Sequence, residues 1–157
     1  MCGNPQKNPV TEEDVCAPLG LYGATKLASE HFCKTYANVF DLDVSIARCT
    51  NVYGPMQNTA NQKTAAFNWM VKQCCEDKEI PLYDNGKIKR DYLYIDDAVT
   101  GIDTVATHGI KGEVYFVGAG NGTSFKQMVD MMIHVAGGGR VRVVESPGFH
   151  QRVGNIS

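Results

Sequence analysis

The 157-residue sequence lacks several features that would each indicate a particular class of protein. No apolar run approaches the roughly 20 residues that a membrane-spanning helix needs, so a membrane-spanning protein is not expected. The formal net charge is only −2 and no basic stripe occurs, which argues against a nucleic-acid partner. The first 14 residues have neither the charged nor the apolar region of a secretory signal. We therefore expect a cytoplasmic protein.

The cysteines also lack the spacing of a metal or disulfide framework. There are 6 cysteines but no C-x-x-C pair, and the 4 histidines are scattered along the chain. Cys74 and Cys75 are neighbours on an expected helix, a geometry that suits neither a shared bridge nor a chelate. We expect reduced thiols that pack as small hydrophobic side chains, and no metal site.

Helical and strand patterns alternate along the chain. Apolar residues recur at helical spacing over 22–40 and 63–76, and short β-branched runs at 43–49 and 140–145 predict strands. The stretch "TNVYGPMQ" between the first strand and the second helix breaks the pattern and predicts a loop. Strands that alternate with helices are typical of an α/β fold.

Two further local signals concern turns and helix starts. The stretches "IPLYD" and "KRDYLYI" flank Asn85-Gly86, which predicts a β-hairpin because Asn-Gly is the strongest short hairpin signal. Asp96 precedes a helical stretch and is expected to be its N-cap. Ser124 and Gln127 have capping-box spacing for a helix that should end near Ala136.

The stretch "LYGATKLASEH" places Tyr22 and Lys26 one helical turn apart. At this spacing both side chains leave the same face of a helix. A lysine ammonium beside a phenol favours the phenolate, which can take a proton from a hydroxyl group or return it in the reverse step. The same spacing also arises by chance on many helices, so the pair alone leaves both interpretations open.

A glycine-rich stretch, "VYFVGAGNGTSF", offers a second candidate site. A glycine loop between a strand and a helix can hold a pyrophosphate, and Glu145 follows at the end of a later strand. The spacing is G-x-G-x-G rather than G-x-G-x-x-G, with threonine at position 123, and the helix is expected to begin only after Ser124. We interpret the stretch as a turn that needs positive φ.

Four stretches together resemble one family. "YGATKLASEH", "ARCTNVYGP", "IPLYDNGKIKRDYLYIDDAV" and "VYFVGAG" occur in this order, as in the extended short-chain dehydrogenase/reductases, the NAD-dependent nucleotide-sugar epimerases and dehydratases that include UDP-glucose 4-epimerase. The resemblance implies an incomplete Rossmann-type fold. Residues 1–60 would be the C-terminal part of the Rossmann-like domain, with the helix that carries Tyr22 and Lys26. Residues 61–157 would mostly be a small nucleotide-sugar-binding subdomain, with a return to the Rossmann sheet near 88–107.

The resemblance assigns roles to the first two of these stretches. Tyr22 would be the catalytic base that takes a proton from a sugar hydroxyl while hydride passes to NAD. Lys26 would hold the nicotinamide ribose and favour the tyrosinate. The loop from Asn51 to Pro55 would line the junction of cofactor and substrate, with Asn51 against the sugar diphosphate and Val52 against the cofactor.

The resemblance also implies substrate contacts in the second half of the chain. Leu82 and Tyr83 would belong to the strand that packs against the nucleotide base. Arg90 matches an arginine that pairs with the diphosphate, for which a planar guanidinium is well shaped. Arg152 resembles a second phosphate arginine, which in the family usually stands in an R-P-G-D sequence rather than the R-V-G-N found here.

Family members are about twice as long, and their NAD-binding glycine loop and catalytic Ser or Thr would precede Met1. The sequence is therefore expected to be the C-terminal half of such an enzyme, trimmed at both ends. Such a piece would expose a strand edge and an apolar helix face, so a homo-oligomer or a second chain that completes the fold is expected. Two alternatives stay open, a non-catalytic nucleotide-sugar-binding fragment without an NAD site and an enzyme assembled from two polypeptides.

Overall fold

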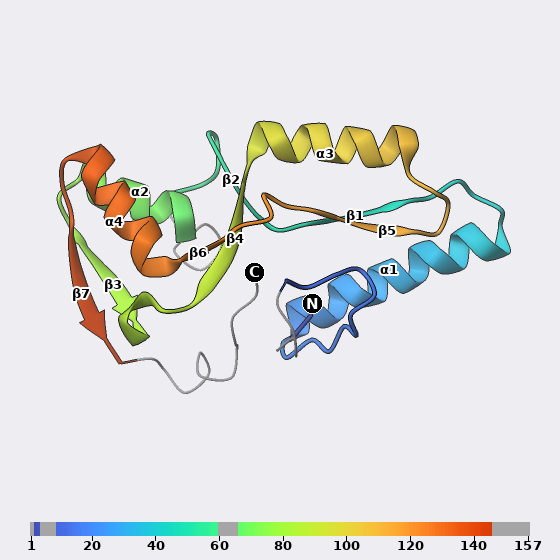
Figure 1. Ribbon diagram of the computed structural model, residues 1–157, viewed down its shortest axis with the longest axis horizontal. Helices are drawn as coiled ribbons and strands as arrows, with labels where there is room; N and C mark the ends of the chain where they lie inside the picture. Colours follow the sequence, from blue (N-terminus) through green and yellow to red (C-terminus); the bar gives the residue numbers. More distant parts are fainter. Residues whose placement is uncertain (1, 4–8, 60–65, 146–157) are drawn as a thin grey trace.

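The computed structural model describes residues 2–3, 9–59 and 66–145. Its elements form two layered parts joined by a central sheet (Figure 1). The first part contains α1 (Leu21–Val39), β1 (Ile46–Cys49), α3 (Ile95–His108) and β5 (Val114–Val117). The second contains α2 (Ala66–Cys75), β3 (Glu79–Tyr83), α4 (Phe125–Ala136) and β7 (Arg140–Val144). The central sheet contains β2 (Asn51–Tyr53), β4 (Lys89–Tyr94) and β6 (Gly122–Ser124).

Most strand pairs are parallel, which confirms the expected α/β class. β1 pairs with β5 from Ile46 opposite Val114, and β2 pairs with β4 from Asn51 opposite Tyr92. β3 pairs with β7 in parallel, whereas β4 and β6 are antiparallel. In the first part, α3 covers one side of the β1–β5 pair and α1 the other (Figure 1).

The predicted hairpin at Asn85-Gly86 is wrong. β3 pairs with β7 and β4 pairs with β2 and β6, so the two flanking strands do not pair with each other. Asn85 and Gly86 have positive φ of 54° and 64°, as turn residues should, but they lie in a short 3-10 helix, Asp84–Gly86. A Cβ at Gly86 would approach Leu82 Cδ1 and the Lys126 nitrogen to 2.7 Å, so close packing also requires glycine there. The turn redirects the chain from one sheet to another.

Two smaller expectations are also corrected. α3 begins at Ile95 with Tyr94 as its N-cap residue, so Asp96 is not the cap. Asp96 and Asp97 instead lie in the first turn, where the positive end of the helix dipole stabilises their carboxylates. The stretch expected to be a loop begins with strand β2, because Asn51–Tyr53 pairs with β4.

The capping box of α4 is confirmed. The Gln127 backbone N–H donates to Ser124 Oγ at 3.2 Å, and the Ser124 backbone N–H donates to Gln127 Oε1 at 3.0 Å. The helix ends at Ala136, and Gly137 follows in the left-handed conformation with φ of 70°. The sequence therefore marked both ends of this helix correctly.

Ser124→Ala is expected to lower the free energy of unfolding by about 1 kcal/mol, because the Gln127 N–H in the first turn of α4 loses its acceptor, Ser124 Oγ. A urea titration measures the change. The matched control is Ser29→Ala, since the exposed Ser29 hydroxyl only donates back to the Thr25 carbonyl inside α1. An equal loss of stability in both variants would contradict a capping role for Ser124.

The main hydrophobic core lies in the second part, between its helices and β3. Its buried members come from α2, β3 and α4: Met70, Cys74, Ile80, Met128, Val129 and Met132. Cys74 is 1% exposed and packs as the small hydrophobic side chain that was expected, and burial raises the pKa of its thiol. A second cluster of Leu93, Ala98 and Val117 joins β4, α3 and β5.

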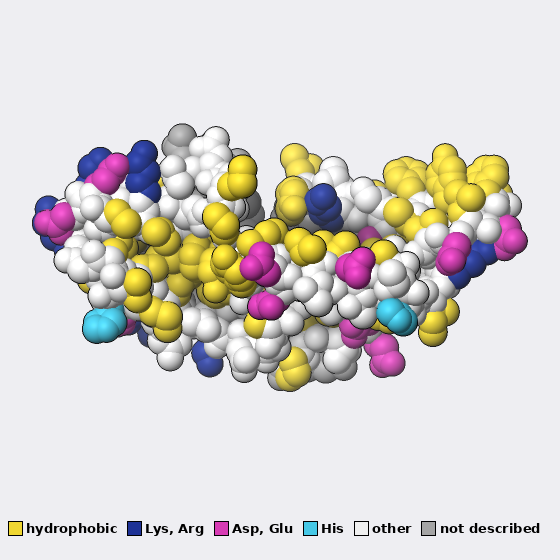
Figure 2. All heavy atoms as spheres, turned by 90° about the horizontal axis from the view of Figure 1, so that it is seen from above, with side chains coloured by type: hydrophobic (Ala, Val, Ile, Leu, Met, Phe, Trp, Pro, Cys, Tyr) yellow, Lys and Arg dark blue, Asp and Glu magenta, His cyan; other side chains and the backbone are white. Residues whose placement is uncertain are grey.

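Hydrophobic side chains also remain exposed on the helices. α1 exposes Phe32 by 67% and Val39 by 66%, and α3 exposes Val99 by 58%. Figure 2 views the molecule from above Figure 1, the side on which α3 lies, and shows hydrophobic side chains gathered on this face. The expected apolar helix face is thus present in the structure. Within the described ranges, no helix is long and apolar enough to cross a membrane.

Candidate functional site

The structure places Tyr22 and Lys26 together in the first turns of α1. The Lys26 ammonium lies 5.5 Å from the centroid of the Tyr22 ring, and Tyr22 is 76% exposed. In Figure 1 the end of α1 that carries Tyr22 points toward the centre of the molecule, where β4 runs. The ammonium therefore lies over the Tyr22 ring at a cation–π distance, and the tyrosine is open to a ligand.

A buried ion pair attaches this helix to the sheet. Arg48 of β1 donates from Nε to Glu30 Oε1 at 2.8 Å and from Nη2 to Oε2 at 2.7 Å. The two side chains are only 8% and 9% exposed. The hydrogen bonds that Arg48 donates to Glu30 hold the pKa of the Arg48 guanidinium above its usual value. This two-bond contact fixes the orientation of α1, and with it the position of Tyr22.

Asn51 and Val52 lie side by side on β2 but face different surroundings. Asn51 is exposed, and its Nδ2 donates to the backbone carbonyl of Asp91 at 2.8 Å. Val52 is half-buried and packs against the Leu93 cluster. The side chain open to a ligand is therefore that of Asn51, while Val52 supports the strand from behind.

Arg90 lies on β4, the strand that pairs with β2. Its side chain is half-buried, and Nη1 donates to the Lys89 carbonyl at 2.9 Å. Burial lowers the pKa of the Arg90 guanidinium, and Tyr92, two residues along the strand, opposes that effect. Because Asn51 is the register partner of Tyr92, the structure brings Asn51 and Arg90 to neighbouring strands of one sheet.

The remaining sequence-predicted residues are placed less favourably for a ligand. Leu82 is 2% exposed and belongs to the core side of β3, so the residue is not accessible to a nucleotide. Tyr83, at the end of the same strand, is half-buried. Arg152 lies outside the described residues. Across the described residues, no group of three or more His, Cys, Asp or Glu side chains could hold a metal ion.

The glycine loop after β5 has the geometry of a turn. Gly120 has a positive φ of 75°, and the chain continues into β6 before α4 begins at Phe125. The N-terminus of α4 is capped by its own Ser124 and Gln127 side chains. The loop therefore does not present a helix N-terminus to a pyrophosphate, and the interpretation as a turn is confirmed.

An open cavity of about 360 Å³ adjoins the end of β2, and sequence reasoning placed only the Tyr53–Pro55 part of it. The Tyr53 ring stacks on Phe67 with centroids 4.1 Å apart and meets the edge of Tyr94 at 5.6 Å. The other side chains come from the loop after β2 and from α2: Thr59, Asn68, Val71 and Lys72. The aromatic residues Phe67, at the start of α2, and Tyr94, at the end of β4, could have indicated this cavity from the sequence.

Comparison with known proteins identifies the family. The model of the NAD dependent epimerase/dehydratase family matches residues 1–118. The dTDP-glucose 4,6-dehydratase of Streptomyces griseus is 32% identical over 144 residues, which cover 90% of this chain and 43% of that protein. The chain belongs to the NAD-dependent epimerase/dehydratase family.

Solved structures agree on the fold. The dTDP-glucose 4,6-dehydratase of Bacillus anthracis str. Ames in complex with NAD is 30% identical, with a TM-score of 0.83 over 99% of this chain and 49% of that one. The UDP-glucuronic acid 4-epimerase of Bacillus cereus, in complex with UDP-glucuronic acid and NAD, is 29% identical, with a TM-score of 0.82 over 99% and 48%. The fold is that of the Rossmann-type enzymes of this family, and the chain spans about half the length of these relatives.

Proposed function

We propose that this chain supplies the acid/base tyrosine and the nucleotide-sugar contacts of an NAD-dependent nucleotide-sugar epimerase or dehydratase. The observation that carries the proposal is the Tyr22–Lys26 pair, with the ammonium 5.5 Å from the ring centroid at the start of α1. Family membership gives that pair its chemical context. Asn51 and Arg90, on adjacent strands of the central sheet, supply the polar groups for a sugar diphosphate.

The proposed reaction begins with oxidation of a sugar carbon that carries a hydroxyl group. Tyr22, as the phenolate, takes the hydroxyl proton while the same carbon loses hydride, and a ketone remains. NAD, when bound, supplies the hydride acceptor. Lys26 stabilises the phenolate before the proton moves. The relatives include both a 4-epimerase and a 4,6-dehydratase, and this first step would serve either reaction.

The residues present fit only the nicotinamide end of NAD, where Tyr22 and Lys26 would meet the ribose. The glycine loop of this chain is a turn, and no G-x-G-x-x-G sequence occurs. We propose that another stretch of polypeptide supplies the dinucleotide loop. The exposed apolar residues of α1, with Phe32 at 67% and Val39 at 66%, give that partner, or a second copy of the chain, a surface to cover.

Arg90→Ala tests the nucleotide-sugar contacts. We expect the Kd for dTDP-glucose or UDP-glucose to rise by about 10- to 100-fold, because charge-assisted hydrogen bonds to the diphosphate are lost from a half-buried position. Isothermal titration calorimetry measures the change. Arg142→Ala is the matched control, since that exposed arginine lies on β7, outside the central sheet, with its Nε 3.6 Å from Glu79 Oε2. Equal affinities of wild type and Arg90→Ala would reject the role of Arg90.

A second candidate function is a nucleotide-sugar-binding module without turnover. It is favoured by one observation, that the glycine loop forms a turn followed by β6 rather than a pyrophosphate cradle. This module would keep Asn51, Tyr83 and Arg90 in use and leave Tyr22 without a cofactor. A test of NAD binding separates the two functions, because the module binds the nucleotide sugar but binds no NAD in any oligomeric state.

A further inference from the structure

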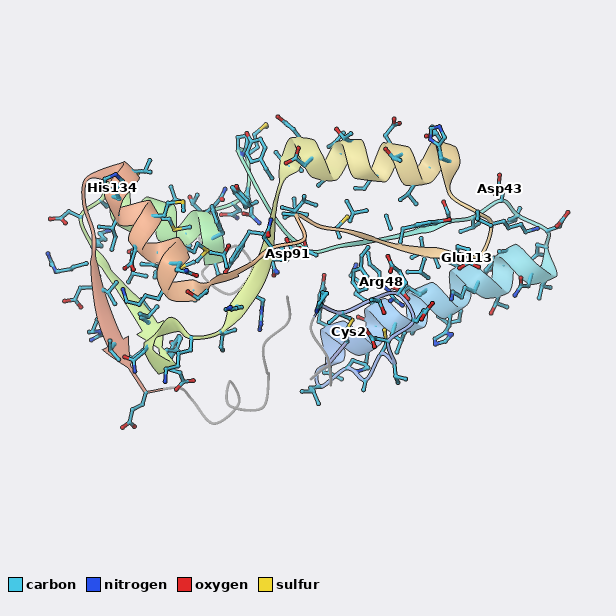
Figure 3. The ribbon with its side chains drawn as sticks, viewed as in Figure 1. Cys2, Asp43, Arg48, Asp91, Glu113 and His134 are labelled. Atoms are coloured by element: carbon cyan, nitrogen blue, oxygen red, sulfur yellow. The ribbon has the colours of Figure 1, made fainter. Side chains whose placement is uncertain are left out.

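The buried side chain of Asp91 lies at the centre of the molecule, where three segments of the chain meet (Figure 3). Asp91 is 7% exposed. Its Oδ1 accepts the Ala119 backbone N–H at 3.0 Å, and its Oδ2 accepts the Gly120 backbone N–H at 2.9 Å. Its own carbonyl accepts the side-chain amide of Asn51 at 2.8 Å. One residue of β4 thus holds both the start of β2 and the loop after β5.

The loop is closely fitted around this carboxylate. A Cβ at Gly118 would approach both Asp91 Oδ2 and Thr50 Cγ2 to 2.8 Å, so a larger residue there would displace one of them. The Thr50 N–H donates to the Val117 carbonyl at 3.0 Å, which closes the loop from the β2 side. Gly120 has a φ of 75°, a conformation that points its N–H at the carboxylate and favours glycine. The loop conformation and the Asp91 side chain therefore depend on each other.

Both hydrogen bonds to the Asp91 side chain join a backbone N–H to a carboxylate. Such charge-assisted bonds are about twice as strong as neutral ones, and burial strengthens them further. A buried carboxylate that lost these donors would be costly, so the two N–H groups and the carboxylate stabilise one arrangement. With both oxygen atoms occupied by the backbone, Asp91 has a holding role rather than a chemical one.

We propose that Asp91 is the positioning residue of the nucleotide-sugar site, an inference that rests on the proposed function. It sets the separation between Asn51 on β2 and the loop Gly118–Gly120, while the preceding residue on the same strand, Arg90, faces the diphosphate. The Asp91 backbone carbonyl orients Asn51, and the Asp91 side chain orients the loop. In this proposal the loop, which follows the carboxyl end of the parallel strand β5, is one wall of the site. A change of the Asp91 side chain would therefore move that wall, whereas the hydrogen bond from Asn51 to the Asp91 backbone carbonyl would remain.

Asp91→Asn, Asp91→Ala and the control Asp103→Asn test this inference. Asparagine keeps one acceptor oxygen but turns an NH₂ group toward a backbone donor, so it should retain about half of the contact, whereas alanine retains none. Asp103 is an exposed carboxylate of α3, so its variant matches the charge change. The first readout is the backbone amide resonances of Ala119 and Gly120 in a ¹⁵N–¹H spectrum. We expect both to shift in the two Asp91 variants and to stay unchanged in Asp103→Asn.

The second readout is the Kd for dTDP-glucose and UDP-glucose, titrated separately well below the thermal unfolding midpoint of each variant. We expect the Kd to rise by about tenfold in Asp91→Asn and further in Asp91→Ala, and to change by less than about twofold in Asp103→Asn. A purely structural role would lower the unfolding midpoint while the folded protein kept its affinity. Should Asp91→Ala fail to fold, Asp91→Asn gives the answer.

Three outcomes would count against the proposal in different ways. Unchanged amide resonances of Ala119 and Gly120 in Asp91→Asn would show that the carboxylate does not hold the loop. Altered resonances with an unchanged Kd would show that the loop does not position the ligand. A wild-type chain that binds neither nucleotide sugar would reject the proposed function itself, and with it the site that Asp91 is proposed to position.

Discussion

Tyr22→Phe is expected to lower turnover of the NAD-loaded enzyme by about 100- to 10,000-fold, the usual contribution of a general acid/base. The substitution removes only the phenolic oxygen that takes the proton. The ring stays in place beside Lys26, whose ammonium lies 5.5 Å from the ring centroid. We therefore expect the Kd for the nucleotide sugar to stay unchanged. Steady-state kinetics and a binding titration of the same preparation measure the two effects.

Tyr36→Phe provides a matched control on the same helix. Tyr36 is also exposed, at 53%, and its ring lies 5.1 Å from that of Phe40. Among the described residues, no lysine ammonium lies over the Tyr36 ring as Lys26 does over Tyr22. Its variant should keep full turnover. If Tyr22→Phe also kept full turnover, Tyr22 would have no part in the proton transfer, and the proposed mechanism would fail.

Glu30→Ala is expected to lower the free energy of unfolding by about 3–5 kcal/mol, the usual cost of leaving one member of a buried ion pair alone. Arg48 would lose two hydrogen bonds, at 2.8 and 2.7 Å, in a position where its side chain is 8% exposed. Its third nitrogen, Nη1, already has no partner among the described residues. A urea titration followed by circular dichroism measures the loss.

Two variants complete that measurement. Asp130→Ala breaks the exposed Lys126–Asp130 pair, whose side chains are 56% and 51% exposed, and should cost no more than about 0.5 kcal/mol. Glu30→Met combined with Arg48→Met removes both charges and should recover most of the stability. A loss below about 1 kcal/mol in Glu30→Ala would contradict a structural role for the pair.

The sequence predicted well those elements that are determined by neighbouring residues. The apolar period of α1 and the capping box of α4 placed both helices within one residue of their observed bounds. The Asn-Gly hairpin was wrong because β3 finds its partner in β7, where Glu79 lies opposite Arg140. Nothing near Asn85 indicates that pairing. The turn residues were recognised for their positive φ, but which strands they connect depends on the whole chain.

The contacts of the candidate site also fall into local ones, which the sequence predicts, and long-range ones, which it does not. Tyr22 and Lys26 are close because they share a helix, so a motif could predict their contact. The Asp91 contacts with Asn51 and Gly120 join segments far apart in sequence, and only the topology brings them together. The alternation of side chains along a strand could have predicted that Leu82 is buried, since Ile80 and Leu82 both lie on the core side of β3.

A native mass spectrum of the purified chain tests the central claim most directly, recorded first alone and then with NAD and dTDP-glucose or UDP-glucose. The account predicts that these 157 residues bind the nucleotide sugar by themselves, and that NAD remains bound only where another stretch of polypeptide supplies the dinucleotide loop. NAD bound to the single chain, or no nucleotide sugar bound in any state, would contradict it.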